Sequence, residues 1–290
     1  MSASTVITIP LSGETGVVRR YADFASHYVL PRHVDIWRPP DYETALTARY
    51  PVIYMHDGQN LFDPDSSYIG VDWGMDEAMM RLIHAHQFPG AIIVGIWNSP
   101  RRLQEYMPCK PLIMSPGRRL LTRFSQDAGG APLSDYYLKF ITTGLKPFID
   151  KTHRTLADRA NTFIMGSSMG GLISLYALTE YPDIFGGAGC LSTHWTIGQE
   201  AMVDYFGAAL PKAGQHRLYF DYGTATLDAD YEPYQQRMDT WLQTAGYTAG
   251  RDWLTRAFDG AEHSERAWRA RADIPLSFLL QPDARSQTTG

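Results

Sequence analysis

The sequence has little cysteine and no long apolar run, and each absence excludes a class of protein. Only two cysteines, Cys109 and Cys190, occur in 290 residues, too few for the disulfide framework of a small secreted domain. No stretch reaches the ~18–20 apolar residues that a membrane-spanning helix needs. The N-terminal residues lack the basic region and apolar core of a secretory signal. We therefore expect a cytoplasmic protein with no membrane partner.

An excess of positive charge is also missing, because 26 lysines and arginines stand against 31 aspartates and glutamates. The net charge of −5 therefore does not indicate a basic surface that would bind nucleic acid. Apolar residues, in contrast, make up 44% of the chain, which is ample for a large buried core. Since there is no repeat or break in composition, we interpret 1–290 as a single domain, with 1–20 a lead-in segment and 281–290 a disordered tail.

Short apolar runs alternate along the chain with segments of helical periodicity. This alternation predicts an α/β fold with a mostly parallel sheet and helices on both faces. The first two strands are expected to pair as an antiparallel lead-in, and 98–134 is expected to be a long irregular loop. The predicted strands are 5–9, 29–37, 50–55, 91–96, 161–166, 185–192, 216–222 and 253–258, and the predicted helices are 72–86, 135–149, 172–178, 231–245 and a last one that carries Trp268.

The sequence Gly166-Ser167-Ser168-Met169-Gly170-Gly171 stands between a predicted strand and a predicted helix. In that context G-x-S-x-G is typical of a nucleophile elbow, in which the central serine is exposed above the sheet. The flanking glycines let strand and helix approach closely, and the helix N-terminus favours negative charge. We interpret Ser168 as the nucleophile, with a glycine-rich turn and a capping serine as the alternative. A phosphate-binding loop is disfavoured because no Gly-Lys-Ser/Thr follows.

Two other loops follow predicted strands and are candidates for substrate contact. Acyl-transfer hydrolases place a second oxyanion donor after an early central strand, and here that position is the loop after 50–55. We predict that the backbone amides of Gln59 and Met169 form the oxyanion hole, with Asp57 and Gly58 contacting substrate; a plain β-turn is the alternative. Trp195 follows the strand 185–192, at the edge where open sheets bind ligands, and is predicted to wall the substrate or simply to pack.

A serine hydroxyl needs a histidine to take its proton, and the histidine needs a carboxylate that fixes its tautomer. His263 follows the last predicted strand, so it has the position and the chain order of the base. The acid should lie in the loop after the penultimate strand, where Asp228 is our prediction. Asp230 and Glu232 remain alternatives, although acids at a helix start also serve as helix N-terminal charges.

The stretches 50–62, 166–171 and 260–268 together make the sequence similar to the esterase D / enterochelin-esterase-like family of α/β-hydrolases. The resemblance implies the α/β-hydrolase fold with an eight-stranded sheet, a triad containing Ser168 and His263, and no metal or organic cofactor. Relatives often carry the acid where this sequence has Thr226, and this departure directs the search to Asp228 or beyond. Family substrates include feruloyl and acetyl sugar esters, siderophore trilactones and thioesters such as S-formylglutathione.

We therefore predict a serine esterase that hydrolyses a small-molecule carboxylic ester through a Ser-His-Asp triad and an acyl-enzyme. Two other classes of function stay open from the sequence. An acyltransferase would pass the same acyl group to an alcohol, and a non-catalytic binding protein would use only the fold. The sequence does not choose among the substrates, and it leaves open whether the chain forms a homo-oligomer.

Overall fold

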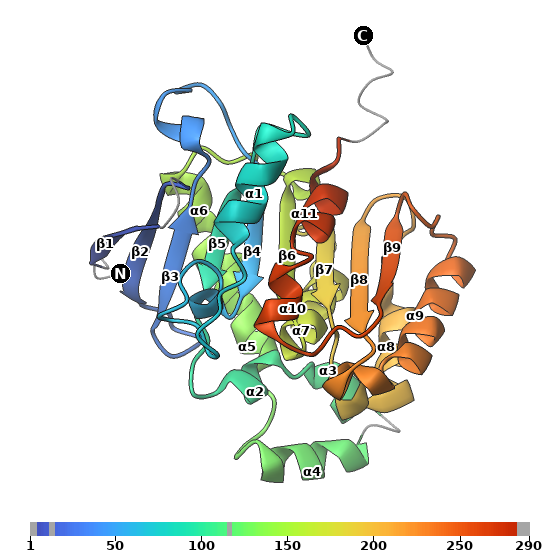
Figure 1. Cartoon of the computed structure of the whole chain (residues 1–290). Coiled ribbons are helices and arrows are strands. Elements are labelled where there is room, and N and C mark those ends of the chain that lie inside the picture. The colour runs from blue at the N-terminus through green and yellow to red at the C-terminus, as the bar shows by residue number, and fades with distance from the viewer. Residues whose placement is uncertain (1–4, 12–14, 115–117, 283–290) are drawn as a thin grey trace.

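One sheet of nine strands runs through the molecule (Figure 1). The computed structural model describes residues 5–11, 15–114 and 118–282, so most of the predicted tail at 281–290 lies outside the described residues. The strands are β1 (Val6–Pro10), β2 (Val17–Phe24), β3 (Arg32–Trp37), β4 (Val52–His56), β5 (Ile92–Ile96), β6 (Thr162–Ser167), β7 (Gly187–Leu191), β8 (Arg217–Gly223) and β9 (Trp253–Phe258), in the spatial order β1-β2-β3-β5-β4-β6-β7-β8-β9. The pairs from β1 to β5 in that order are antiparallel and the other pairs are parallel, which confirms the mostly parallel sheet.

β2 is the strand that the sequence pattern did not predict, and it makes the sheet nine-stranded instead of eight-stranded. It lies between β1 and β3, so the predicted direct pairing of 5–9 with 29–37 is wrong. Two consecutive arginines, Arg19 and Arg20, interrupt the alternation of apolar and polar residues that would mark it as a strand. In the folded sheet Arg20 reaches across to Asp35 of β3 with two hydrogen bonds of 2.8 Å, and this cross-strand ion pair accommodates the charge.

Helices cover both faces of the sheet and enclose two separate apolar cores. Figure 1 shows α1, α10 and α11 on the near face and α7 and α8 behind the strands. Alternate residues of β4 serve the two cores, with Val52 and Tyr54 in one and Ile53 and Met55 in the other, which explains its continuous apolar run. The helices are α1 (Met75–His84), α2 (Arg102–Tyr106), α3 (Cys109–Ile113), α4 (Arg118–Asp127), α5 (Ser134–Lys139), α6 (Lys146–Thr152), α7 (Met169–Glu180), α8 (Gln199–Ala209), α9 (Glu232–Thr244), α10 (Glu265–Arg269) and α11 (Asp273–Leu280).

The segment 98–134 is not the irregular loop that its composition predicted. It forms α2, α3 and α4, and Figure 1 shows α4 beyond α2 and α3, at the end of the molecule where α7 begins. Two of these helices are only five residues long, too short for a clear apolar period, and α2 buries a charge. That charge is Glu105, which forms a buried ion pair with Arg32 at 2.7 Å. Across the described residues, none of the helices combines the length and apolarity needed to cross a membrane.

Two buried histidines give the fold a predictable response to acid. His56, at the end of β4, has its pKa lowered to about 3 by burial, and burial likewise lowers the pKa of His153 to about 4. The ordinary histidine pKa is near ~6.5, so over this interval the unfolded chain binds protons that the folded chain excludes. The free energy of unfolding is therefore expected to be highest above pH ~6.5. Below that pH it should decrease toward pH ~4, by roughly 1.4 kcal/mol per pH unit for each histidine.

Urea denaturation at several pH values between 7.5 and 5 measures this loss. His56→Gln cannot take up the proton, so its plot of unfolding free energy against pH should be shallower than that of wild type by about one histidine's share. His27→Gln, at an exposed site, is the matched control and should keep the wild-type slope. Equal slopes for His56→Gln and wild type would show that His56 is not excluded from protonation in the folded state.

Candidate active site

Ser168 occupies the turn between β6 and α7 in a backbone conformation that few residues with a side chain adopt. Its φ of 57° and ψ of −123° lie outside the usual allowed regions. The Ser168 N–H donates to the Leu191 carbonyl at 2.9 Å, which ties the turn to the end of β7. A Cβ atom at Gly166 would lie 3.0 Å from the backbone of Gly170, so the glycines permit the close approach of strand and helix.

His263 and Asp228, from loops that follow neighbouring strands, are hydrogen-bonded. His263 Nδ1 lies 2.5 Å from Asp228 Oδ1, and Oδ2 accepts hydrogen bonds from Ser192 Oγ at 2.5 Å and from the Gly223 N–H at 2.6 Å. Burial alone would raise the pKa of Asp228, but these donors outweigh it and leave the pKa lowered. Because an ionised Asp228 can only accept, Nδ1 of His263 must carry the proton, and Nε2 of a neutral His263 is therefore free to accept one.

The other acids of this loop do not reach the histidine ring. Asp230 and Glu232 are exposed, and Glu232 accepts a hydrogen bond from Gln236 one helical turn away. Thr226 accepts a hydrogen bond from the backbone N–H of His263 at 2.8 Å. It therefore stabilises the backbone of the loop that carries His263 and does not contact the imidazole ring through this bond. Within the described part of the chain, no hydrogen bond joins Ser168 to His263.

The loop after β4 is fixed by an ion pair that the sequence did not reveal. Both oxygens of Asp57 accept from Arg102, at 2.7 and 2.8 Å, and Oδ1 also accepts from Asn98 at 2.7 Å. Burial raises and these partners lower the pKa of Asp57, and the partners prevail. A Cβ atom at Gly58 would lie 2.5 Å from the backbone of Gly95. Asp57 and Gly58 therefore shape the loop, and their predicted contacts with substrate stay a prediction.

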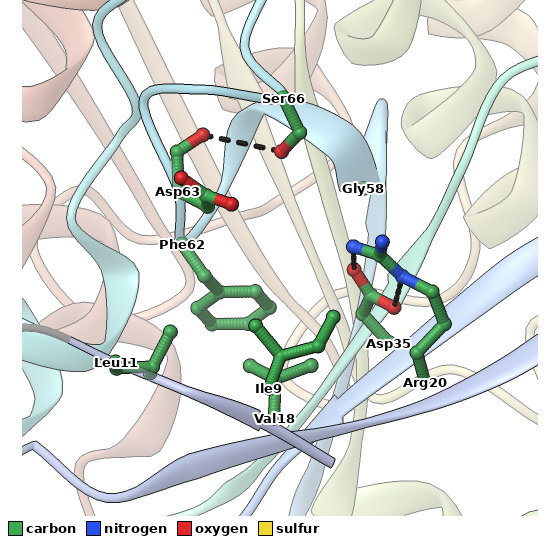
Figure 2. A pocket seen from close by; sticks show the side chains of 9 residues that line it. All are labelled: Ile9, Leu11, Val18, Arg20, Asp35, Gly58, Phe62, Asp63 and Ser66. Atoms are coloured by element: carbon green, nitrogen blue, oxygen red, sulfur yellow. Dashed lines mark hydrogen bonds and ion pairs between the residues drawn. The ribbon is translucent and has the colours of Figure 1, made fainter. Parts of the chain in front are cut away.

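The lead-in strands support this loop from the side shown in Figure 2. Phe62 packs there on Val18 in the same core, with Ile9 and Leu11 against it. The small cavity between them has a volume of about 10 Å³, too small for an ester. Residues 1–20, predicted only as a lead-in, thus include side chains that back the loop carrying Gln59.

The two predicted oxyanion donors lie on turns that touch. Met169 is the first residue of α7, so its N–H is among those that a helix leaves without an intrahelical acceptor. The start of α7 packs on the end of β4, since a Cβ atom at Gly170 would lie 3.4 Å from His56 Cβ and 3.7 Å from Asp57 Oδ2. Gln59 follows two residues later in the short 3-10 helix Gly58–Asn60.

Trp195 does not line the site. Its side chain is 1% exposed, its Nε1–H donates to Gln235 at 3.1 Å, and its ring stacks on Phe220. The prediction of a substrate wall is corrected to core packing, the alternative that the sequence had left open.

His194, the residue before Trp195, is the site residue that the sequence analysis did not single out. Its backbone N–H donates to the Ser168 carbonyl at 3.2 Å, and its Nδ1 lies 2.6 Å from the hydroxyl of Tyr231. The Tyr231 ring lies in turn 5.9 Å from the His263 ring. Burial first, and then the charges of His263 and Arg102, lower the pKa of His194 to about 4, so it is neutral near pH 7. Its place at the end of a predicted parallel strand was the available signal.

A cleft of about 640 Å³ lies between the start of α8 and the start of α9. Its lining includes Thr196, two residues after His194, and Ala229 and Asp230, which directly follow Asp228.

Among all residues that the structure describes, no three His, Cys, Asp or Glu side chains are grouped so as to hold a metal ion.

Comparison with known proteins gives one family. The chain matches the family described as "Putative esterase" over residues 30–272. It is 26% identical over 200 residues to the uncharacterized protein YbbA of Bacillus subtilis (strain 168), covering 69% of this chain and 71% of YbbA. It is 29% identical over 157 residues to the ferri-bacillibactin esterase BesA of the same organism, covering 51% of this chain and 50% of BesA.

Among solved structures, the enterobactin esterase FES from Shigella flexneri in the presence of enterobactin superposes with a TM-score of 0.69 at 19% identity. The match covers 94% of this chain and 61% of FES. The chain thus shares the fold of FES over nearly its whole length, while it spans only about half of BesA.

Proposed function

Because the chain belongs to this esterase family and is a carboxylic ester hydrolase, we propose that it works as a serine esterase with Ser168 as nucleophile, His263 as general base and Asp228 as the orienting acid. The observation that carries the proposal is the 2.5 Å contact between His263 Nδ1 and a buried Asp228, at the sheet edge where Ser168 caps α7. An intact pair of this kind favours catalysis over a binding-only use of the fold.

The proposed reaction follows from the proton positions. Nε2 of His263 takes the Ser168 proton as Oγ attacks the ester carbonyl, and the imidazolium that forms is stabilised by Asp228. The N–H groups of Met169 and Gln59 are proposed to donate to the developing oxyanion. His263 then gives the proton to the leaving alkoxide, which departs as the alcohol and leaves an acyl-enzyme. Water, activated by the same histidine, releases the acid and restores Ser168.

The substrate is proposed to be a small-molecule ester that extends beyond the reacting group. The cleft of about 640 Å³, lined in part by Ala229 and Asp230, lies in the ~300–1,000 Å³ range of small-molecule sites. BesA is named for ferri-bacillibactin and FES was solved with enterobactin, so siderophore esters should be tested first. A panel that adds feruloyl, acetyl-sugar and simple acyl esters ranks the classes by kcat/KM.

The general base gives this proposal a pH signature. His263 must be neutral to accept the Ser168 proton, so kcat/KM for a chromogenic ester is expected to rise with pH as this histidine loses its proton. His194 should add no step there, since its pKa is about 4. His263→Ala should lose the activity together with the titration. A kcat/KM that stays flat from about pH 5 to 9, with chemistry limiting, contradicts the role of His263.

A further inference from the structure

Ser192, directly after β7, is at the centre of a buried hydrogen-bond network behind the catalytic histidine. The residue is fully buried and has a φ of 41°, in the left-handed region. Its Oγ lies within hydrogen-bond distance of Trp268 Nε1 at 3.0 Å, of Arg271 Nη2 at 3.1 Å and of Asp228 Oδ2 at 2.5 Å. These partners come from two separate stretches of the chain, Asp228 from one and Trp268 and Arg271 from the other, so the hydroxyl joins parts that only the fold brings together.

The donors and acceptors of this network leave the Ser192 hydroxyl a single orientation. Indole and guanidinium nitrogens can only donate, so Trp268 and Arg271 occupy both acceptor positions of Ser192 Oγ. The one hydroxyl proton must then go to Asp228 Oδ2. Asp228 in turn has no other role than to accept, from Ser192 and Gly223 on one oxygen and from His263 on the other.

The far end of the network is a buried ion pair. Arg271 donates to Asp221 at 2.9 and 3.1 Å, and the side chains of the two residues are 3% and 0% exposed. Asp221 also accepts from the Tyr219 hydroxyl at 2.9 Å. A guanidinium held in this way cannot turn away from Ser192 without leaving a buried charge unpaired.

The same network holds the segment that follows His263. Trp268, in α10, packs its ring edge-on against the His263 ring, with centroids 5.1 Å apart and an interplanar angle of 81°. Its Nε1–H is at the same time bonded to Ser192. The Ser192 hydroxyl therefore contacts both neighbours of the His263 ring, Asp228 and Trp268.

We propose that Ser192 is a positioning residue of the reaction, which couples the Arg271–Asp221 ion pair to Asp228 and so fixes the carboxylate and tautomer that His263 needs. The inference rests on the proposed function of Ser168, His263 and Asp228. It adds a residue that touches neither the substrate nor the reacting atoms. Loss of the hydroxyl leaves Asp228 Oδ2 with the Gly223 N–H as its one remaining donor. It also removes the acceptor of the Trp268 Nε1–H and one of the two acceptors of Arg271 Nη2, which keeps Asp221.

Ser192→Ala tests the inference through kcat/KM and its dependence on pH. We expect kcat/KM to fall ~10–100-fold, by analogy with the loss of hydrogen-bond partners behind metal-ligating histidines. We also expect the acid limb of the plot of kcat/KM against pH to move to higher pH. The reason is that the Asp228 carboxylate, once it has lost a donor, stabilises the imidazolium form of His263 more strongly. Thr193→Val is the matched control: Thr193 is a buried hydroxyl on the same turn that donates to the Cys190 carbonyl and not to the network. Its acid limb should coincide with that of wild type.

A double-mutant cycle separates positioning from a general loss of packing. Trp268→Phe keeps a ring against His263 and removes only the donor to Ser192, so its effect on kcat/KM should largely vanish when Ser192 is already alanine. If Ser192→Ala keeps kcat/KM within threefold of wild type with an unmoved acid limb, or if the two effects simply add, Ser192 is structural and the inference fails. Failure of the proposed function is a separate result, because wild type itself would then show no titrating ester hydrolysis and no reaction of Ser168 with a fluorophosphonate.

Discussion

Replacing Ser168 by alanine is expected to lower kcat by roughly 10⁴–10⁶-fold while the protein stays folded, as for other triad serines. The reason is that no acyl-enzyme can form without the hydroxyl at the turn between β6 and α7. The remaining rate would come from the oxyanion donors and from substrate binding. Alanine, like serine, has a Cβ atom, so the strain of the φ of 57° is the same in both proteins. A difference in kcat between wild type and Ser168→Ala therefore reports on the loss of the hydroxyl.

Ser167→Ala is the control for this substitution, since Ser167 is the neighbouring buried serine at the end of β6. It should retain ester hydrolysis within a few-fold of wild type. Far-ultraviolet circular dichroism and thermal unfolding of both variants show whether the fold is kept. If Ser168→Ala hydrolyses the ester within tenfold of wild type, Ser168 is not the nucleophile.

The second large effect is expected at Asp228. Asp228→Asn should lower kcat by up to roughly 10⁴-fold with little change in fold, because the amide favours the wrong histidine tautomer. An amide NH₂ placed toward His263 would donate to Nδ1, so the ring would carry its proton on Nε2 and could not accept one from Ser168. The Gly223 N–H and Ser192 hydroxyl would meanwhile keep the asparagine in place through its remaining oxygen.

Asp230→Asn and Glu232→Gln are the matched controls, because both carboxylates belong to the same stretch of chain and both are exposed. Each should hydrolyse the ester at close to the wild-type rate. The assignment of the acid is wrong if one of these two variants loses activity while Asp228→Asn works normally. Ser168 and His263 would keep their proposed roles in that case.

Features that depend on neighbours in the sequence could be predicted, and features that depend on distant partners could not. The turn at Ser168 is local, since it needs only a strand, two glycines and a helix within a few residues, and the structure has it. The parallel strands were found because burial on both faces leaves continuous apolar runs. β2 was missed because Arg20 is neutralised by Asp35, which is 15 positions away.

The same distinction applies to the candidate site. Asp57 could be expected near the reaction from its position after β4, but its partner Arg102 is 45 positions away, so its framework role needed the structure. Trp195 stands at the right edge of the sheet, and only packing shows that its ring turns into the core. The role of Ser192 could not be predicted, because Asp228, Trp268 and Arg271 meet it only in the fold.

Mass spectrometry after treatment with a fluorophosphonate is the sharpest test of Ser168 as the activated nucleophile. Attack by the Ser168 oxygen would displace fluoride and leave one phosphonyl group per chain. A single adduct is expected on the peptide that contains Ser168, together with loss of ester hydrolysis, slower labelling in Asp228→Asn and none in Ser168→Ala. An adduct on another residue, or an unlabelled wild-type protein that hydrolyses esters normally in the presence of the reagent, would contradict this role of Ser168.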